Sequence, residues 1–86
     1  MAFKIAAHLA WQRLQDEAVI IDIPARVAVG LNQAGLFIWE RLEQNAENEI
    51  TRMVADNFEI DLEQARRDVA SFLEEMTSRG FIETGA

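Results

Sequence analysis

The chain contains no cysteine and no tyrosine, and only one histidine and one proline occur among its 86 residues. Without cysteine there is no disulfide, no thiolate nucleophile and no cysteine-ligated zinc or iron–sulfur site. The single histidine, His8, has no partner histidine for a metal site, and neither Ser71 nor Thr77 has a base within helical reach. We therefore expect a protein that is not an enzyme, with no catalytic residue, no bound metal and no cofactor.

Long apolar runs are missing as well, and none exceeds the four residues of Ala18–Ile21. A transmembrane helix needs about 20 consecutive apolar residues. The short apolar patch at the N-terminus is interrupted by His8, and no small-residue cleavage site follows it, so a signal peptide is not predicted. We expect a cytoplasmic protein that makes no contact with a membrane.

Basic residues are scarce relative to acidic ones: Lys and Arg number 8, Asp and Glu number 15, and the formal net charge is −7. The excess is confined to the later part of the chain. Residues 1–31 carry three charges of each sign, whereas residues 32–86 carry five basic and twelve acidic groups. Such a surface repels polyanions, so nucleic acid is not an expected partner.

Half of the residues are hydrophobic, and a chain of 86 residues is near the lower limit for building its own core. We expect one domain over residues 1–86, with its folded core at about residues 9–82. Pro24 marks the end of a strand, since proline donates no hydrogen bond to a ladder. Segments with alternating apolar or β-branched residues predict an antiparallel meander of strands at residues 9–14, 18–23 and 26–29.

Helical spacing of apolar residues begins after Asn32, which is itself a typical N-cap. The third helical segment is the clearest, because Asp61 can cap its start, with Gln64 in capping-box relation. Gly80 stands where a C′ glycine belongs. We predict helices at residues 33–43, 47–57 and from Asp61 to Gly80, the last with a buried stripe of Leu62, Ala65, Val69, Phe72, Leu73 and Met76.

The two ends of the chain are expected to behave differently from its middle. Phe81 and Ile82 follow the last helix and should pack back or add a last short strand, whereas residues 1–7 and 83–86 are expected to fray. Strands followed by helices in so short a chain predict an α+β fold. Its outline is that of a winged helix-turn-helix domain, with a three-stranded antiparallel N-terminal meander followed by three helices.

A three-stranded meander leaves an edge whose backbone N–H and C=O groups have no partner. If the segment at residues 26–29 is that edge and the third helix packs beside it, an extended peptide can add a strand in the groove between them. Small Ala70 would leave room for an incoming side chain, and Arg26 and Arg66 would flank the groove and favour a ligand with acidic residues. The predicted peptide-binding residues are Arg26, Val27, Ala28, Val29, Arg66, Val69, Ala70 and Leu73.

Other interpretations of the same residues stay open. The apolar members of this set are equally expected in an ordinary core, and Arg66 could simply pair with Asp61 or Glu63. The winged-helix outline also suggests a DNA-binding regulator, with Gln64 and Arg67 beside Arg66 on the third helix. A third possibility is a structural subunit that dimerises through the strand edge, and we expect a monomer or a weak dimer.

Two segments of the chain carry a resemblance to a known family. The first spans Val29–Leu42 and reads V-x-L-N-x-x-G-x-x-I-W-E-x-L, and the second spans Val69–Ile82 and reads V-x-x-F-L-E-E-M-x-x-x-G-F-I. In this order and spacing they resemble the PqqD family, small domains also called RiPP recognition elements, over about residues 11–82. The loop at residues 43–46 departs from the family, since many relatives have an Asp-Gly turn there.

The resemblance implies a winged-helix-like, non-catalytic domain that binds the leader region of a ribosomally made precursor peptide. In the family the leader adds a strand beside the third strand and against the third helix, which correspond here to residues 26–29 and to Arg66, Val69, Ala70 and Leu73. The implied partners are this precursor and a modifying enzyme, often a radical S-adenosylmethionine enzyme. The implied pathway is biosynthesis of pyrroloquinoline quinone or of another modified peptide, such as a lasso peptide.

Overall fold

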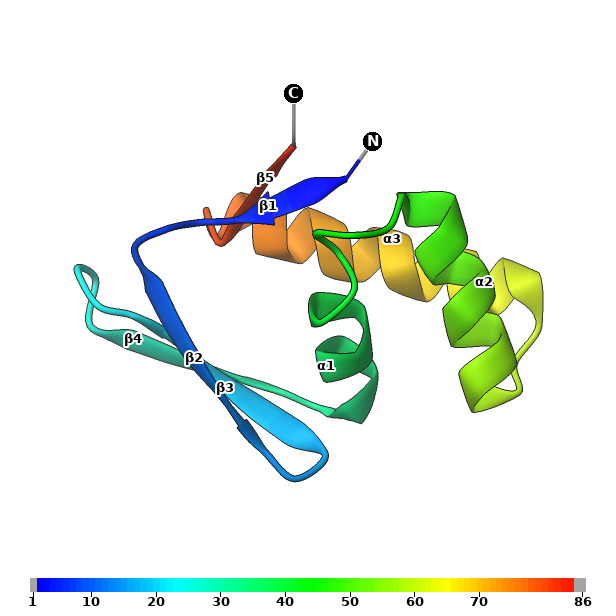
Figure 1. Ribbon diagram of the computed structural model, residues 1–86, viewed down its shortest axis with the longest axis horizontal. Coiled ribbons are helices and arrows are strands. Elements are labelled where there is room, and N and C mark those ends of the chain that lie inside the picture. Colours follow the sequence, from blue (N-terminus) through cyan, green and yellow to red (C-terminus); the bar gives the residue numbers. More distant parts are fainter. Residues whose placement is uncertain (1, 85–86) are drawn as a thin grey trace.

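The computed structural model describes residues 2–84, in which five strands and three helices follow one another (Figure 1). Strands β2, β3 and β4 form an antiparallel meander, and two short strands, β1 and β5, pair as a second sheet. The predicted α+β fold, a meander followed by three helices, is confirmed. In chain order the elements are β1 (Phe3–Ile5), β2 (Leu9–Leu14), β3 (Glu17–Asp22), β4 (Val27–Leu31), α1 (Gln33–Trp39), α2 (Glu47–Phe58), α3 (Leu62–Ser78) and β5 (Ile82–Thr84).

The meander follows the strand pattern of the sequence, with one correction in the turn before β4. A two-residue turn at Gln15 and Asp16 joins β2 to β3, and residues 23–26 join β3 to β4. Arg26, expected in the third strand, adopts a left-handed φ of 58° in this second turn. An L-residue takes that conformation in turns and not in strands. β4 therefore begins one residue later than predicted and continues to Leu31.

The N-terminal segment is folded, so the expectation that residues 1–7 fray is wrong for most of it. β1 pairs antiparallel with β5 at the other end of the chain. The backbone N–H of Phe3 donates to the carbonyl of Leu42 at 3.0 Å, and that of Ala6 donates to the carbonyl of Phe81 at 2.9 Å. These partners are distant in sequence, which is why local pattern did not reveal the strand.

The C-terminal end of α3 is closed as its glycine predicts. Gly80 has a φ of +75°, its N–H donates to the carbonyl of Thr77, and the N–H of Phe81 donates to the carbonyl of Met76. This pair of bonds is a Schellman motif. It turns the chain back into β5, so the predicted return of the apolar tail is confirmed, and residues 83 and 84 are paired rather than frayed. The fraying expected at residues 1, 85 and 86 lies outside the described residues.

The helices begin where their caps predict, but the first ends early. Asn32 Oδ1 accepts the N–H of Gly35 at 2.9 Å, and Asp61 Oδ1 accepts the N–H of Gln64 at 2.7 Å. α1 ends at Trp39, before the predicted Glu43, and the chain continues in turns. Among residues 2–84, none of the helices is long and apolar enough to span a bilayer.

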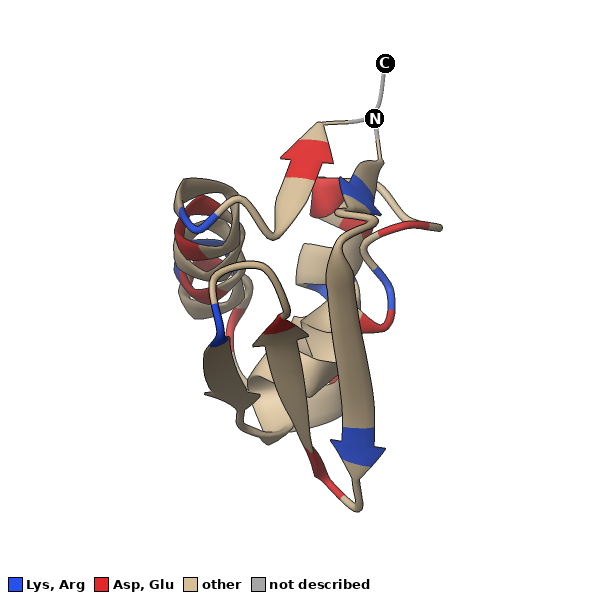
Figure 2. Ribbon diagram, turned by 90° about the vertical axis from the view of Figure 1, so that its left-hand side faces the viewer, with Lys and Arg blue, Asp and Glu red and all other residues tan. Residues whose placement is uncertain are grey.

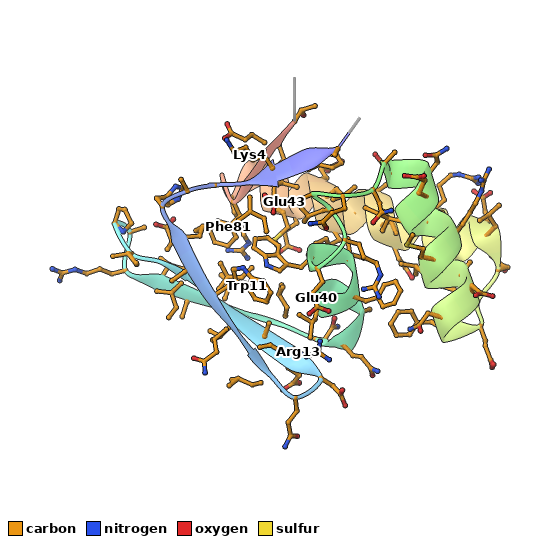
Figure 3. All side chains as sticks on the ribbon, viewed as in Figure 1. Lys4, Trp11, Arg13, Glu40, Glu43 and Phe81 are labelled. Atoms are coloured by element: carbon orange, nitrogen blue, oxygen red, sulfur yellow. The ribbon has the colours of Figure 1, made fainter. Side chains whose placement is uncertain are left out.

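α1 is held between the meander and the other helices by Trp39, which is 1% exposed. The ring of Trp11 on β2 meets that of Trp39 edge to face, with 6.1 Å between the ring centroids. Arg13 and Glu40 point toward one another from β2 and from the end of α1, with 2.9 Å between Nη1 and Oε2 (Figure 3). Leu62, expected in the buried stripe of α3, is instead 44% exposed, because this first residue of the helix lies beyond the core.

Replacing Gly80 with alanine is expected to lower the free energy of unfolding by about 1 kcal/mol, because a Cβ is strained in a left-handed conformation. The matched control is Gly30→Ala: Gly30 is not left-handed, and no atom lies within 4 Å of the added Cβ. The control should leave stability unchanged or slightly raised. Urea denaturation followed by tryptophan fluorescence measures both, and equal effects would contradict the role given to the φ of Gly80.

Candidate functional site

A groove of about 490 Å³ lies between the edge strand β4, the start of α1 and one flank of α3. Figure 2 looks along α3 and shows it beside β4, the outermost strand of the meander on that side. A groove therefore lies between the third meander strand and the third helix, but of the residues predicted for it only Val29 is in its lining. It is lined by Val29, Gly30, Leu31, Asn32, Ala34, Gly35, Ile38, Asp68, Ser71, Phe72, Glu75 and Met76.

At the inner end of the groove the Phe72 side chain of α3 reaches Gly35 in the first turn of α1. A Cβ on this residue would lie 3.2 Å from Cε1 of Phe72 and 3.3 Å from Oδ1 of Asn32. Glycine therefore allows the first turn of α1 to rest against Phe72 while Asn32 caps the same turn. The two contacts together join the first turn of α1 to the flank of α3 beside the end of β4.

The outer side of the groove is the free edge of β4, which among the described strands pairs with β3 alone. The two-residue turn between β2 and β3 makes Leu14 and Glu17 a hydrogen-bonded pair. Because bonding direction alternates along each strand, the main chain of Val29 then faces β3. The N–H and C=O groups of Ala28 and Gly30 face away from the sheet, where an added strand can pair with them.

The predicted strand residues lie at this edge to different extents. Val29 lines the groove. Ala28 precedes Val29 in the strand and is exposed. Its outward-facing backbone groups, rather than its side chain, are available to an added strand. Val27 is 42% exposed and Arg26 belongs to the turn, and neither lines the groove.

The predicted helix residues do not line the groove, which corrects the geometry expected for α3. Val69 and Leu73 are core residues, 0% and 4% exposed. Arg66 and Ala70 are exposed outside the lining, and Arg66 pairs with Glu63 at 3.0 Å, the simple ion pair that the sequence also allowed. The structure thus brings together the edge strand and α3, but through a different face of the helix.

Helical geometry explains the correction. Successive residues turn by about 100° around the helix axis, so Arg66 and Ala70 fall on one flank of the buried stripe. Asp68, Ser71 and Glu75 fall on the opposite flank, which faces β4. The buried stripe can be read from the sequence, whereas the flank that meets the sheet depends on tertiary packing. The sequence signal that could have identified this flank is the bulky Phe72, which widens the apolar stripe on the side of the groove.

The charged groups of the lining are both acidic. Glu75 is held by Arg79, with 3.1 Å between Oε2 and Nη2. Asp68 accepts a hydrogen bond from Nε2 of Gln64 at 2.8 Å and forms no ion pair among the described residues. The expected preference for an acidic ligand rested on arginines that lie outside the lining, so it loses its basis.

The remaining lining side chains make an apolar floor. Ile38 and Met76 are 3% and 1% exposed, and Phe72 is half-buried between them and solvent. In the part of the chain that the structure describes, no group of three or more His, Cys, Asp or Glu side chains could hold a metal ion. An apolar floor beside a free strand edge is suited to an extended peptide whose side chains enter the groove.

Comparison with known proteins found a matching family model and similar solved structures. The family model of coenzyme PQQ synthesis protein D (PqqD) matches residues 17–82. A solved structure described as TbiB1 in complex with the TbiA(beta) leader peptide shares 25% sequence identity and a TM-score of 0.86, over 96% of this chain and 98% of that chain. Lasso peptide synthetase B1 complexed with the leader peptide superposes with a TM-score of 0.87 over 95% of this chain and 98% of that chain, at 17% identity, which shows the fold alone. No curated protein sequence matches the chain.

Replacing Asn32 with alanine removes the cap of α1 at the inner end of the groove, and is expected to lower the free energy of unfolding by about 1 kcal/mol. Asn32→Asp keeps an oxygen acceptor for the N–H of Gly35 and should cost far less. Denaturant unfolding of the two variants checks the difference. Equal destabilisation would mean that the hydrogen bond is not what the side chain contributes.

Proposed function

The chain belongs to the PqqD family, and we propose that it is a peptide chaperone that binds the leader region of a ribosomally made precursor. The observation that carries the proposal is the free edge of β4 beside the groove. A leader segment would add a strand to that edge and place apolar side chains on the floor formed by Ile38, Phe72 and Met76. The domain itself catalyses no reaction.

The physical mechanism is strand addition with apolar anchoring. The outward N–H and C=O groups of Ala28 and Gly30 would bond to the peptide backbone, which gives affinity without reading sequence. Contacts between the side chains of the peptide and the groove would give specificity. Binding in the micromolar to sub-micromolar range, about −8 to −10 kcal/mol, suits a carrier that must release its cargo.

The comparisons support this proposal because two similar structures are complexes with a leader peptide. By analogy, the captured precursor would be presented to a modifying enzyme, such as a radical S-adenosylmethionine enzyme, in the cytoplasm. Holding the leader on a carrier that docks on the enzyme raises the effective concentration of the segment to be modified. Biosynthesis of pyrroloquinoline quinone or of another modified peptide is the pathway class that the family suggests.

Nucleic acid is not a favoured ligand. A recognition helix needs basic side chains that are free to contact phosphates and base edges. On α3, Arg66 and Arg79 are instead paired with Glu63 and Glu75, at 3.0 and 3.1 Å. Arg67 has no acidic partner among the described residues and bonds to the amide oxygen of Gln64 at 3.1 Å. The net charge of −7 adds repulsion over the whole surface.

Amide chemical shifts titrated with synthetic leader peptides of candidate precursors should change mainly in β4 and along the groove flank of α3. In Ala28→Pro the outward donor is lost, and the dissociation constant should rise by about tenfold, because an unpaired backbone acceptor remains on the peptide. The fold should persist, since proline is tolerated on an edge strand.

The matched control for this variant is Ala28→Val, which keeps the N–H at the same position. It should bind like the parent protein. Equal loss of affinity in both variants would point to the side chain rather than to strand addition, and the absence of any shift in the parent protein would remove the proposed function.

Substitutions at two neighbouring residues of α3 test which flank of this helix contacts the peptide. Ser71→Trp places a large side chain in the groove, and should weaken leader binding by at least about tenfold, the factor that 1.4 kcal/mol of lost contact produces. Ala70→Trp adds the same side chain outside the groove lining and should leave binding unchanged. Calorimetric titration of both variants checks the assignment; the reverse result would place the peptide on the Ala70 flank.

A further inference from the structure

The charge of the groove distinguishes among possible peptides. Its lining contains two carboxylates, those of Asp68 and Glu75, and no Lys or Arg. Glu75 has its own cation, because Arg79 bonds to it through both Nε and Nη2, at 3.2 and 3.1 Å. Asp68 has a neutral partner, the amide of Gln64, at 2.8 Å. One carboxylate is therefore left without a counter-ion on the wall that an added strand would face.

The position of Asp68 suits contact with a side chain of the ligand. It lies on the groove flank of α3, one turn before Ser71 and Phe72, and opposite the strand residues Val29 and Gly30. Side chains of an added strand alternate between the two faces of the sheet, so those that enter the groove would meet both the apolar floor and this wall. A Lys or Arg side chain is long enough to lay its methylene stem on the floor while its head reaches the carboxylate.

We propose that the groove selects peptides that carry a basic residue next to their apolar anchor, and that Asp68 is the specificity-determining residue. This inference rests on the proposed function, since it concerns the same groove and names the class of peptide it takes. This preference for basic residues is opposite to the preference for acidic residues that Arg26 and Arg66 suggested. Charge over the whole protein acts in the same direction, because a net charge of −7 favours encounter with cationic peptides.

The closing experiment is a selection from a displayed library of random peptides on the intact protein and on three variants. Peptides enriched on the parent protein should contain Lys or Arg next to an apolar residue more often than the unselected library does. The preference for a basic residue next to the apolar anchor should fall on Asp68→Asn below the level seen on Asp56→Asn, which has the same net charge, and should fall further on Asp68→Lys. The matched control is Asp56→Asn on α2, an exposed carboxylate outside the lining, which should select the same peptides as the parent protein.

One enriched peptide then serves for a quantitative test. Replacing its basic residue with Gln should weaken binding to the parent protein by about threefold to fivefold, the range expected for a partly exposed ion pair. The same replacement should have no effect on binding to Asp68→Asn, since the coupled carboxylate is absent. Asp68→Asn, Asp68→Lys and Asp56→Asn each keep an exposed polar side chain, so folding is expected to be unchanged. Circular dichroism checks this.

The outcomes separate the two proposals. Enrichment of apolar peptides without a basic preference, or a basic preference as strong on Asp68→Asn as on Asp56→Asn, would overturn the role of Asp68 while leaving strand addition in place. If no peptide is enriched over the unselected library on any variant, the proposed function itself fails, and the inference fails with it. The basic peptides selected on the parent protein are also titrated into Ser71→Trp. Undiminished binding there would place the cation site outside the groove and would overturn the inference.

Discussion

The contact between the Phe72 ring on α3 and Gly35 in the first turn of α1 is the interaction around which the groove is built. A Cβ there would lie 3.2 Å from Cε1 of Phe72, so a larger residue would require the ring to move by a few tenths of an ångström. α1 begins directly after β4, with Asn32 as its cap. The same contact therefore lies where the end of β4, the start of α1 and the flank of α3 meet, at the inner end of the groove.

A free strand edge is ordinarily a hazard, because it pairs with any other exposed strand. In this protein the edge is short, its open groups belong to Ala28 and Gly30, and a carboxylate without a counter-ion lies on the opposite wall. Two copies of the chain, each with a net charge of −7, also repel each other. Under the proposed function, one distribution of charge would thus discourage self-association and favour a cationic peptide.

The comparison between sequence and structure is most instructive where they differ. The strand β1 was not predicted, because its three residues have no strong local pattern and their partners are at the other end of the chain. Arg26 was expected in a strand, yet it has a left-handed φ in a turn. For α3 the buried stripe was largely correct, but Arg66 and Ala70 were assigned to the groove although they lie on the flank away from it. Each difference reflects long-range contacts that no local window contains.

The sequence by itself determined the local features: the caps at Asn32 and Asp61, the closing turn at Gly80, the alternation of the meander strands and the family resemblance. These depend on hydrogen bonds and backbone preferences within a few residues. Only the tertiary structure decided which flank of α3 faces β4, and therefore whether arginines or Asp68 line the groove. Rotation of a helix about its axis is set by packing against distant elements, here the packing of α3 on α2 together with Phe72 against Gly35.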